Sequence, residues 1–274
     1  MKKLVYLFVL WLVIAGAVHA QDSVKLAQRL VQLSGLEIQL RSVPKGFEEQ
    51  MVALKGKMPD DLLFALTDAG RAAYNPELMA KEIAGTLAQT LKPAEMQKVL
   101  AWLETPVGRR VTIAEEKASS TMDEASLKKF AEQVKAKPPS AERQKLVQEL
   151  VEVTNAVEFG ANLMEGTSLG VAIGMDSTQP VEKRVGAAFI RKQIEKMMPK
   201  EQVKAALRES MPGIYGYTYR EVSDADLRSY LAMLRTPEGK QVNDEITKAF
   251  TQAMVAASLR VGQLVDQRNP KRPV

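Results

Sequence analysis

Histidine and cysteine are almost absent from this sequence. The 274 residues contain no cysteine and one histidine, His19, which lies in an apolar N-terminal segment that we expect to be removed. Ser-His-Asp and Cys-His nucleophiles need an imidazole to accept the proton, and zinc sites are built mainly from His and Cys. These absences exclude such enzymes, such zinc sites and disulfides. We therefore expect no catalytic residue, no cofactor and no metal site.

The N-terminal twenty residues have the pattern of a secretory signal peptide. Lys2 and Lys3 precede an apolar run from Leu4 to Val18, and Val18-His19-Ala20 is a small-residue cleavage site. The alternative is an uncleaved membrane anchor, but the run is shorter than the roughly 20 residues that span a bilayer. We expect residues 1–20 to be cleaved after Ala20, leaving no membrane-spanning segment. An exported chain without disulfides predicts a periplasmic location.

A strong excess of charge of either sign is also missing. The formal net charge of +5 falls to +3 when Lys2 and Lys3 leave with the signal. Nucleic-acid-binding proteins concentrate Lys and Arg on one face, so we expect no nucleic-acid partner. The basic tail, residues 267–274, is expected to be a disordered end, with contact to anionic lipid as the alternative.

One short phrase occurs twice, 131 residues apart. Residues 91–118 and 222–249 align without a gap and share ten identities in twenty-eight positions. Upstream, residues 25–31 align with residues 145–151 at a spacing of 120. Self-similarity at a fixed distance indicates a repeated structural unit. It predicts a first helical repeat over residues 21–134, a linker over 135–140 and a second repeat over 141–266.

Apolar residues recur at helical spacing, and no alternating run suits a strand. Met96, Val99, Leu100 and Leu103 lie at i, i+3, i+4 and i+7. The pattern predicts an all-α bundle built from two related halves, without significant β-sheet.

These blocks resemble a known bacterial group. The phrase Leu-x-x-Leu-x-Thr-Pro-x-Gly-Arg/Lys, behind a signal peptide and an amphipathic helix, is similar to the domain-of-unknown-function 2059 family. Residues 91–118 and 222–249 carry the resemblance as two tandem divergent copies, with weaker support from 24–36 and 146–157. It implies a small, exported, helical protein without an established activity, and it supplies no catalytic residue.

The Thr-Pro-x-Gly phrase itself predicts a bend between two helices. Proline ends the preceding helix and suits the first position of the next, while the threonine hydroxyl can accept a hydrogen bond from a free amide. The alternative is an anion site at the helix start, beside Arg109, Arg110 or Lys240. The residues of the two motifs are Thr105, Pro106, Gly108, Thr236, Pro237 and Gly239.

Two segments of the second half are candidate ligand or interface sites. Gly166, Gly170 and Gly174 follow one another at four-residue spacing, which lets a second helix approach closely, either in an oligomer or within the core. Tyr215, Tyr217 and Tyr219 cluster before the second repeated block, where aromatic rings line a pocket or cover a helix junction.

Three classes of function remain, in order of preference. The first is a non-enzymatic envelope protein that binds a partner protein or itself. The second is a carrier of a small apolar ligand in a cavity between the halves, lined by residues such as Trp102, Tyr215, Tyr217 and Met233. The third is a hydrolase using carboxylates alone, which needs two acids from distant segments in one cleft. The acid pairs Asp60-Asp61 and Glu115-Glu116 are interpreted as surface residues.

Overall fold

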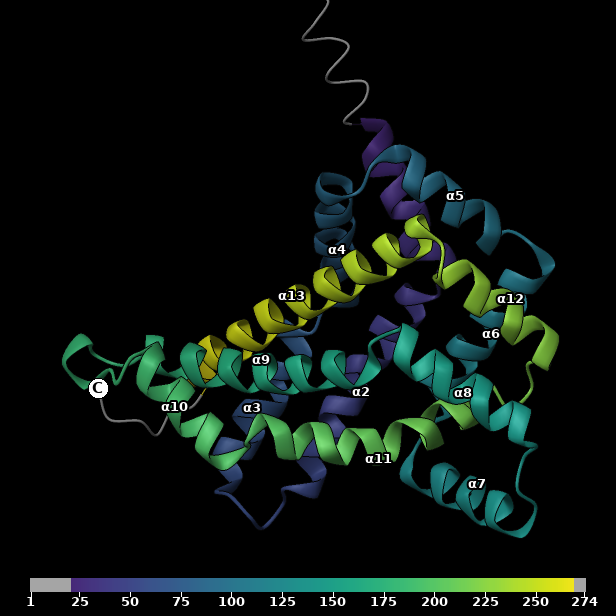
Figure 1. The fold of residues 1–274 in the computed structure, drawn as a ribbon. Helices are drawn as coiled ribbons and strands as arrows, with labels where there is room; N and C mark the ends of the chain where they lie inside the picture. Colours follow the sequence, from purple (N-terminus) through teal and green to yellow (C-terminus); the bar gives the residue numbers. More distant parts are fainter. Residues whose placement is uncertain (1–20, 269–274) are drawn as a thin grey trace, which may run out of the picture.

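The computed structural model describes residues 21–268, and this part of the chain is helical without a strand (Figure 1). The all-α prediction is thus confirmed for the described residues, while the predicted signal peptide and most of the predicted tail lie outside them. In chain order the helices are residues 21–33, α2 (Leu36–Ala53), α3 (Asp60–Ala73), α4 (Pro76–Thr90), α5 (Pro93–Leu103), α6 (Pro106–Thr121), α7 (Glu124–Ala136), α8 (Ala141–Val153), α9 (Ala156–Ser177), the short 3-10 helix η1 (Val181–Lys183), α10 (Ala187–Met197), α11 (Lys200–Thr218), α12 (Asp224–Leu234) and α13 (Pro237–Arg268).

Local sequence chemistry sets several helix boundaries. Asn75 caps α4 by accepting a hydrogen bond from the Leu78 amide at 2.9 Å, with Pro76 at the first helical position. Gly35 ends the first helix in the left-handed conformation, with φ of 73°, and Asn155 does the same between α8 and α9, with φ of 53°. These two turns are 120 residues apart, which is the spacing of the upstream sequence blocks.

The long helix α13 lies at the centre of the molecule. It runs beside α9 and also packs on α3, α4 and α5 (Figure 1). One face presents Ala249, Ala253 and Ala257 at four-residue spacing, all at most 4 % exposed. Because these side chains are small, α13 lies close to the helices that it covers.

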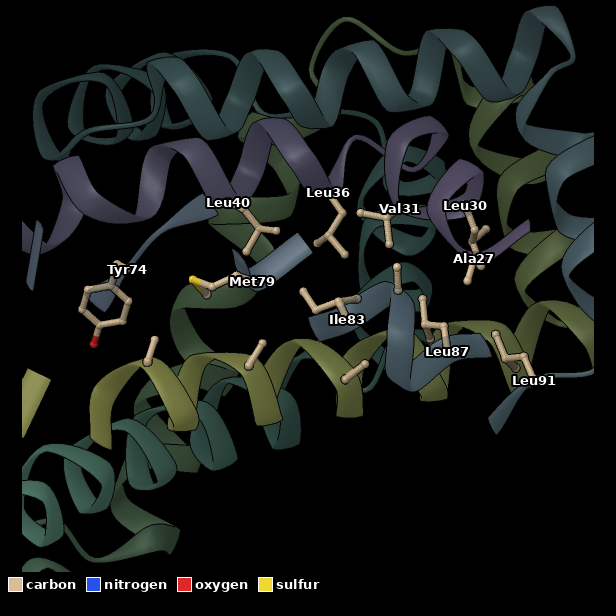
Figure 2. Close-up of a cluster of buried hydrophobic side chains, with 14 of the residues drawn as sticks. Ala27, Leu30, Val31, Leu36, Leu40, Tyr74, Met79, Ile83, Leu87 and Leu91 are labelled. Carbon is tan, nitrogen blue, oxygen red and sulfur yellow. The ribbon is translucent and has the colours of Figure 1, made fainter. Parts of the chain in front are cut away.

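The main core joins this helix to the first part of the chain. Figure 2 shows Leu36 and Leu40 directed towards Met79 and Ile83 of α4, with α13 passing along the same cluster. The buried residues of this core therefore come from residues 21–103 and from α13. A helix of the second predicted half completes the core of the first.

In a smaller core, a helix of the first predicted half packs on helices of the second. Val111 of α6 packs with residues of α8 and α12, including Leu150, Leu227 and Leu231. The helix that follows the Thr-Pro turn thus packs across the predicted boundary in each case. Residues 21–134 and 141–266 are not separate globular units. The predicted linker is also shorter than expected, because α7 continues to Ala136 and only residues 137–140 are non-helical.

Candidate functional site: a tyrosine and glutamate cavity

A cavity of about 220 Å³ lies where α5, α6, α11, α12 and α13 meet. It is lined by residues from both sides of the predicted linker, and many of them occupy equivalent places in the two sequence blocks. Trp102 and Met233, for example, are 131 residues apart and both line it. The other lining pairs at this spacing are Val99 and Tyr230, Leu103 and Leu234, Val111 and Val242, Thr112 and Asn243, and Glu115 and Ile246.

Glu115 and three tyrosines lie together in the lining of the cavity, which also contains the polar residues Ser34, Gln39, Thr112, Thr154, Asn243 and Thr247. The hydroxyls of Tyr219 and Tyr230 donate to the same carboxylate oxygen of Glu115, Oε1, at 2.6 and 3.1 Å. The Tyr215 hydroxyl lies 2.8 Å from the Thr154 hydroxyl. Two phenols on one oxygen hold the carboxyl group in a defined position and leave its second oxygen, Oε2, without a hydrogen bond to the described residues.

The rings around this carboxyl group are in mutual contact. Trp102 stacks on Tyr230 with ring centroids 5.3 Å apart, and Tyr219 meets Tyr230 and Tyr215 edge-on at 6.1 and 5.9 Å. Such tilted and offset arrangements are the favoured geometries of aromatic pairs. The rings therefore form a continuous aromatic wall beside Glu115.

Burial changes the acidity of these groups. Removal of Glu115 from water raises its pKa to about 7, although the hydrogen bonds from Tyr219 and Tyr230 act in the opposite direction. Burial likewise raises the pKa of Tyr215 to about 12 and holds those of Tyr219 and Tyr230 well above the usual value. The tyrosines are therefore neutral donors at neutral pH, and the Glu115 carboxyl group is divided between its two protonation states.

The prediction that Glu115 is a surface residue is wrong. Glu115 lies on α6 at i+4 from Val111 and i−3 from Ala118, both of them buried, so helix geometry turns it inward. The position equivalent to Glu115 in the second block is Ile246, an apolar residue that lines the same cavity. That apolar counterpart is the sequence signal that identifies the buried glutamate.

The three predicted tyrosines point to different places. Tyr215 and Tyr219 are four residues apart and both reach the cavity. Tyr217, between them, lies on the other side of the chain, where its ring meets Phe130 edge-on at 5.6 Å and the Arg220 guanidinium lies 3.9 Å from its centroid. The expectation that Tyr217 lines the same cavity is therefore wrong. Tyr230, which the sequence did not single out, takes that place.

Both Thr-Pro-x-Gly motifs form a turn between two helices. The hydroxyls of Thr105 and Thr236 each accept from the amide three residues on, that of Gly108 or Gly239, at 3.0 Å. A side chain at either glycine would meet the carbonyl oxygen of the preceding helix, at 2.3 Å for Gly108 and 2.0 Å for Gly239. Pro106 and Pro237 each occupy the first helical position.

Two of the three basic residues near these turns face protein carboxylates. Arg110 donates to Asp226 at 2.8 and 2.9 Å, and Lys240 pairs with Asp244 at 2.5 Å, whereas Arg109 is exposed and has no ion pair among the described residues. The amide at the third position of each helix is already bound by its threonine. The turns therefore act as capped helix junctions, and this geometry gives no support to an anion site.

The glycine stripe of α9 is covered by α13 of the same chain. A side chain added at Gly166 would meet Val255, one at Gly170 would meet Ser258, and one at Gly174 would lie 2.3 Å from the Leu259 carbonyl oxygen. The stripe is thus a contact within the chain. Of the two alternatives that the sequence left open, contact with a helix of the same chain is the one observed, because α13 fills the space beside the stripe.

A larger groove lies between α7, α8 and α11, at the lower right of Figure 1. Its volume is about 1240 Å³, and Phe130, Val147 and Ile214 are among its apolar lining residues. Five basic side chains also line it, and no acidic side chain does so within the described part of the chain. The basic residues are Lys135, Lys137, Arg143, Lys145 and Arg220.

Both arginines of the groove have structural partners: Arg220 donates to the Tyr217 carbonyl oxygen at 2.7 Å and Arg143 binds three acceptors. The Arg143 guanidinium donates to the Val222 carbonyl oxygen at 2.8 Å and to Asp224 at 3.0 Å, and also to the carbonyl oxygen of Tyr219. Lys135, Lys137 and Lys145 are exposed. The positive charge that remains open to a ligand in the groove therefore comes mainly from lysines.

The described residues contain no group of three or more acidic or metal-binding side chains that could hold a metal ion. Nor does any described helix have the length and apolar character needed to pass through a bilayer. Comparison with curated proteins gave no match, and comparison with solved structures gave none either. Residues 77–134 match the family described as "Uncharacterized protein conserved in bacteria (DUF2059)". This segment runs from α4 to α7 and includes Glu115, and over these residues the predicted resemblance to the DUF2059 family is confirmed.

Proposed function

We propose that this protein is an exported, non-enzymatic component of the bacterial cell envelope that binds a partner protein in the groove between α7, α8 and α11. The observation that carries the proposal is the combination of an apolar groove with exposed lysines and no lining acid. Export to the periplasm rests on the signal-like pattern of residues 1–20.

The proposed occupant of the groove is an acidic amphipathic helix of the partner. The volume exceeds the roughly 300–1,000 Å³ that is usual for small-molecule pockets, whereas a helix laid into an apolar groove is a common mode of recognition. Glutamates along the edges of such a helix would complement Lys135, Lys137 and Lys145.

Gly213 offers a direct test of the groove. It lines the groove within α11, is exposed, and has open space where a side chain would be added. Gly213→Trp should therefore fill the groove without disturbing the fold. Gly85→Trp is the matched control, because Gly85 is also helical with open space around it but lies on α4, away from the groove.

The binding partner in the assay is a labelled amphipathic peptide of about sixteen residues, with a leucine face and flanking glutamates, measured by fluorescence polarisation. We expect the wild type and Gly85→Trp to bind it alike, Gly213→Trp to bind at least tenfold more weakly, and a peptide with flanking lysines to bind poorly. Equal binding of both peptides, or no effect of Gly213→Trp, would refute the proposal. A lipid that co-purifies in native mass spectrometry and is lost from Gly213→Trp would assign the groove to a carrier function instead.

The carrier function is the second candidate, and one observation favours it. Trp102, Tyr215 and Met233, which the sequence placed in a cavity between the halves, do line a common cavity. A carboxylate-only hydrolase receives no such support. Within the described residues, Glu115 is the single carboxylate of this cavity, and the α7 groove has none. A third groove, between α9 and α13, is lined by Gly166 and Gly170 among others and contains one carboxylate, Glu165.

We also propose that the two halves arose by duplication. The equal geometry of the two Thr-Pro turns, the left-handed residues Gly35 and Asn155, and the paired lining positions of the cavity support this origin.

A further inference from the structure

We propose that the cavity beside Glu115 binds a small organic ammonium ion, with the ion held between the aromatic wall and the Glu115 carboxylate. This inference rests on the cavity of the carrier candidate but assigns it a cationic ligand in place of an apolar one, and it does not depend on the α7 groove. It rests on the charge, the lining and the size of the cavity.

The charge of the cavity is unbalanced. Glu115 is its only charged side chain, and no Lys or Arg lines it within the described residues. A carboxylate removed from water is costly unless it is paired, and phenol hydrogen bonds only partly replace a counter-charge. Because Oε2 has no hydrogen-bond partner among the described residues, a cation can meet this oxygen without displacing Tyr219 or Tyr230.

The lining is suited to an organic cation. Trp102, Tyr215, Tyr219 and Tyr230 come from α5, the end of α11 and α12, and all four rings line the same space. Aromatic rings attract alkylated ammonium groups through the negative potential of their faces, and this attraction grows when water is excluded. Inorganic divalent cations prefer several carboxylate and carbonyl oxygen ligands, whereas Glu115 is the only carboxylate in this lining within the described residues.

The size limits the ligand further. A volume of about 220 Å³ is below the range of drug-sized pockets and corresponds to roughly seven waters at about 30 Å³ each. It therefore admits one compact group, such as a trimethylammonium head with a short chain. A free solute and a lipid headgroup both carry this chemistry.

The binding of a cation and the ionisation of Glu115 are coupled. The groups around its carboxyl are the hydroxyls of Tyr215, Tyr219 and Tyr230 and the neighbouring Glu116, none of which supplies positive charge. Only the ionised form of Glu115 attracts the ligand, so affinity should rise as the pH is raised through 7, and binding should release a proton.

The test compares choline with its uncharged carbon analogue, 3,3-dimethylbutan-1-ol, on the purified protein by isothermal titration calorimetry. We expect choline to bind at least tenfold more tightly than the analogue at pH 8, to bind several-fold more weakly at pH 6, and to release a proton that is detected by changing the buffer. Glu115→Gln should lose the preference for choline, and Glu116→Gln, the matched neighbour, should keep it.

Equal affinity for choline and its analogue would overturn the proposal and leave an apolar cavity, and absence of choline binding at pH 8 would overturn it as well. The wild-type comparison and its pH dependence do not require any variant to fold. Co-sedimentation with phosphatidylcholine vesicles separates the two sources: binding that depends on Glu115 assigns a lipid headgroup, and choline binding without sedimentation assigns a free solute. Gly213→Trp should leave choline binding unchanged. Refutation of choline binding in the cavity is therefore distinct from refutation of partner binding in the α7 groove.

Discussion

Replacing Gly174 with alanine probes a close backbone approach between α9 and α13. An added methyl group would lie 2.3 Å from the Leu259 carbonyl oxygen and 2.9 Å from the Gly262 Cα, roughly 1 Å short of ordinary contact. These are backbone atoms and cannot rotate away, so the two helices must separate. Overpacking of this kind lowers the free energy of unfolding by up to about 3 kcal/mol, while the higher helix propensity of alanine raises it by about 1 kcal/mol.

We therefore expect Gly174→Ala to lower the free energy of unfolding by about 2 kcal/mol. Gly85→Ala is the matched control: its methyl group enters open space on α4, so the free energy of unfolding should rise by about 0.5–1 kcal/mol. For a chain of this length, the two changes correspond to melting temperatures about 4–8 °C lower and about 1–4 °C higher.

Urea titration followed by circular dichroism at 222 nm measures both values under the same conditions. If Gly174→Ala were as stable as Gly85→Ala, α9 and α13 could not be in direct contact at this point, and the assignment of the glycine stripe to the core would fail. The double variant Gly174→Ala with Gly262→Ala adds a check. Both changes open the same contact, so the second should cost less than it does alone.

Three further predictions concern single side chains, each measured by urea titration. The native pKa of Glu115, about 7, lies above its unfolded value, so the native state binds the proton more tightly and the free energy of unfolding falls by at most about 3 kcal/mol as the pH rises from about 4 to 7. Glu115→Gln should lose this pH dependence and be more stable than the wild type above pH 7. An unchanged pH dependence in Glu115→Gln would contradict the burial of Glu115. Thr105→Ala and Thr236→Ala should each cost about 1 kcal/mol, since each removes a cap, and serine at either position should restore it. Arg143→Lys should lower the free energy of unfolding by about 1.5–3 kcal/mol, because one ammonium group cannot reach all the acceptors that the guanidinium group binds. An unchanged free energy of unfolding would show that these hydrogen bonds do not stabilise the fold.

Helix boundaries could be predicted because they depend on neighbouring residues. Thr105 caps the helix whose start the Thr-Pro-x-Gly phrase predicts, and Asn75 and Ser223 cap α4 and α12 in the same way, Ser223 through the Asp226 amide at 3.1 Å. The Asp226 carboxylate, in contrast, is bound by Arg110 from a distant segment. Neighbouring residues thus determine the helix cap, and tertiary contacts determine which partner the remaining side chains bind.

The candidate site could be predicted only in part. Trp102, Tyr215 and Met233 were expected to share a cavity, and they do. Glu115 was not expected there, since an acid next to another acid on a helix is ordinarily solvent-exposed. Its inward direction follows from the buried neighbours of α6, whose identity depends on packing against α11 and α12.

The helix that packs on the glycine stripe also could not be predicted from sequence periodicity. Spacing shows that Gly166, Gly170 and Gly174 share a face, but it cannot say which helix meets that face. The answer is α13, which buries alanines on one side and meets the glycines on another. Because α13 is packed on more than one face, its apolar residues do not form a single stripe, and its sequence shows only a weak amphipathic pattern.

The position of α13 sets the order in which this chain becomes a folded protein. The helix is made last, yet the core of residues 21–103 is incomplete until α13 has joined it. Folding of the N-terminal part therefore depends on contacts about 180 residues away, as between Tyr74 and Ser258, which are 184 positions apart. The N-terminal segment alone therefore lacks the apolar side chains of α13 that complete its core, and removal of α13 would expose that core to solvent.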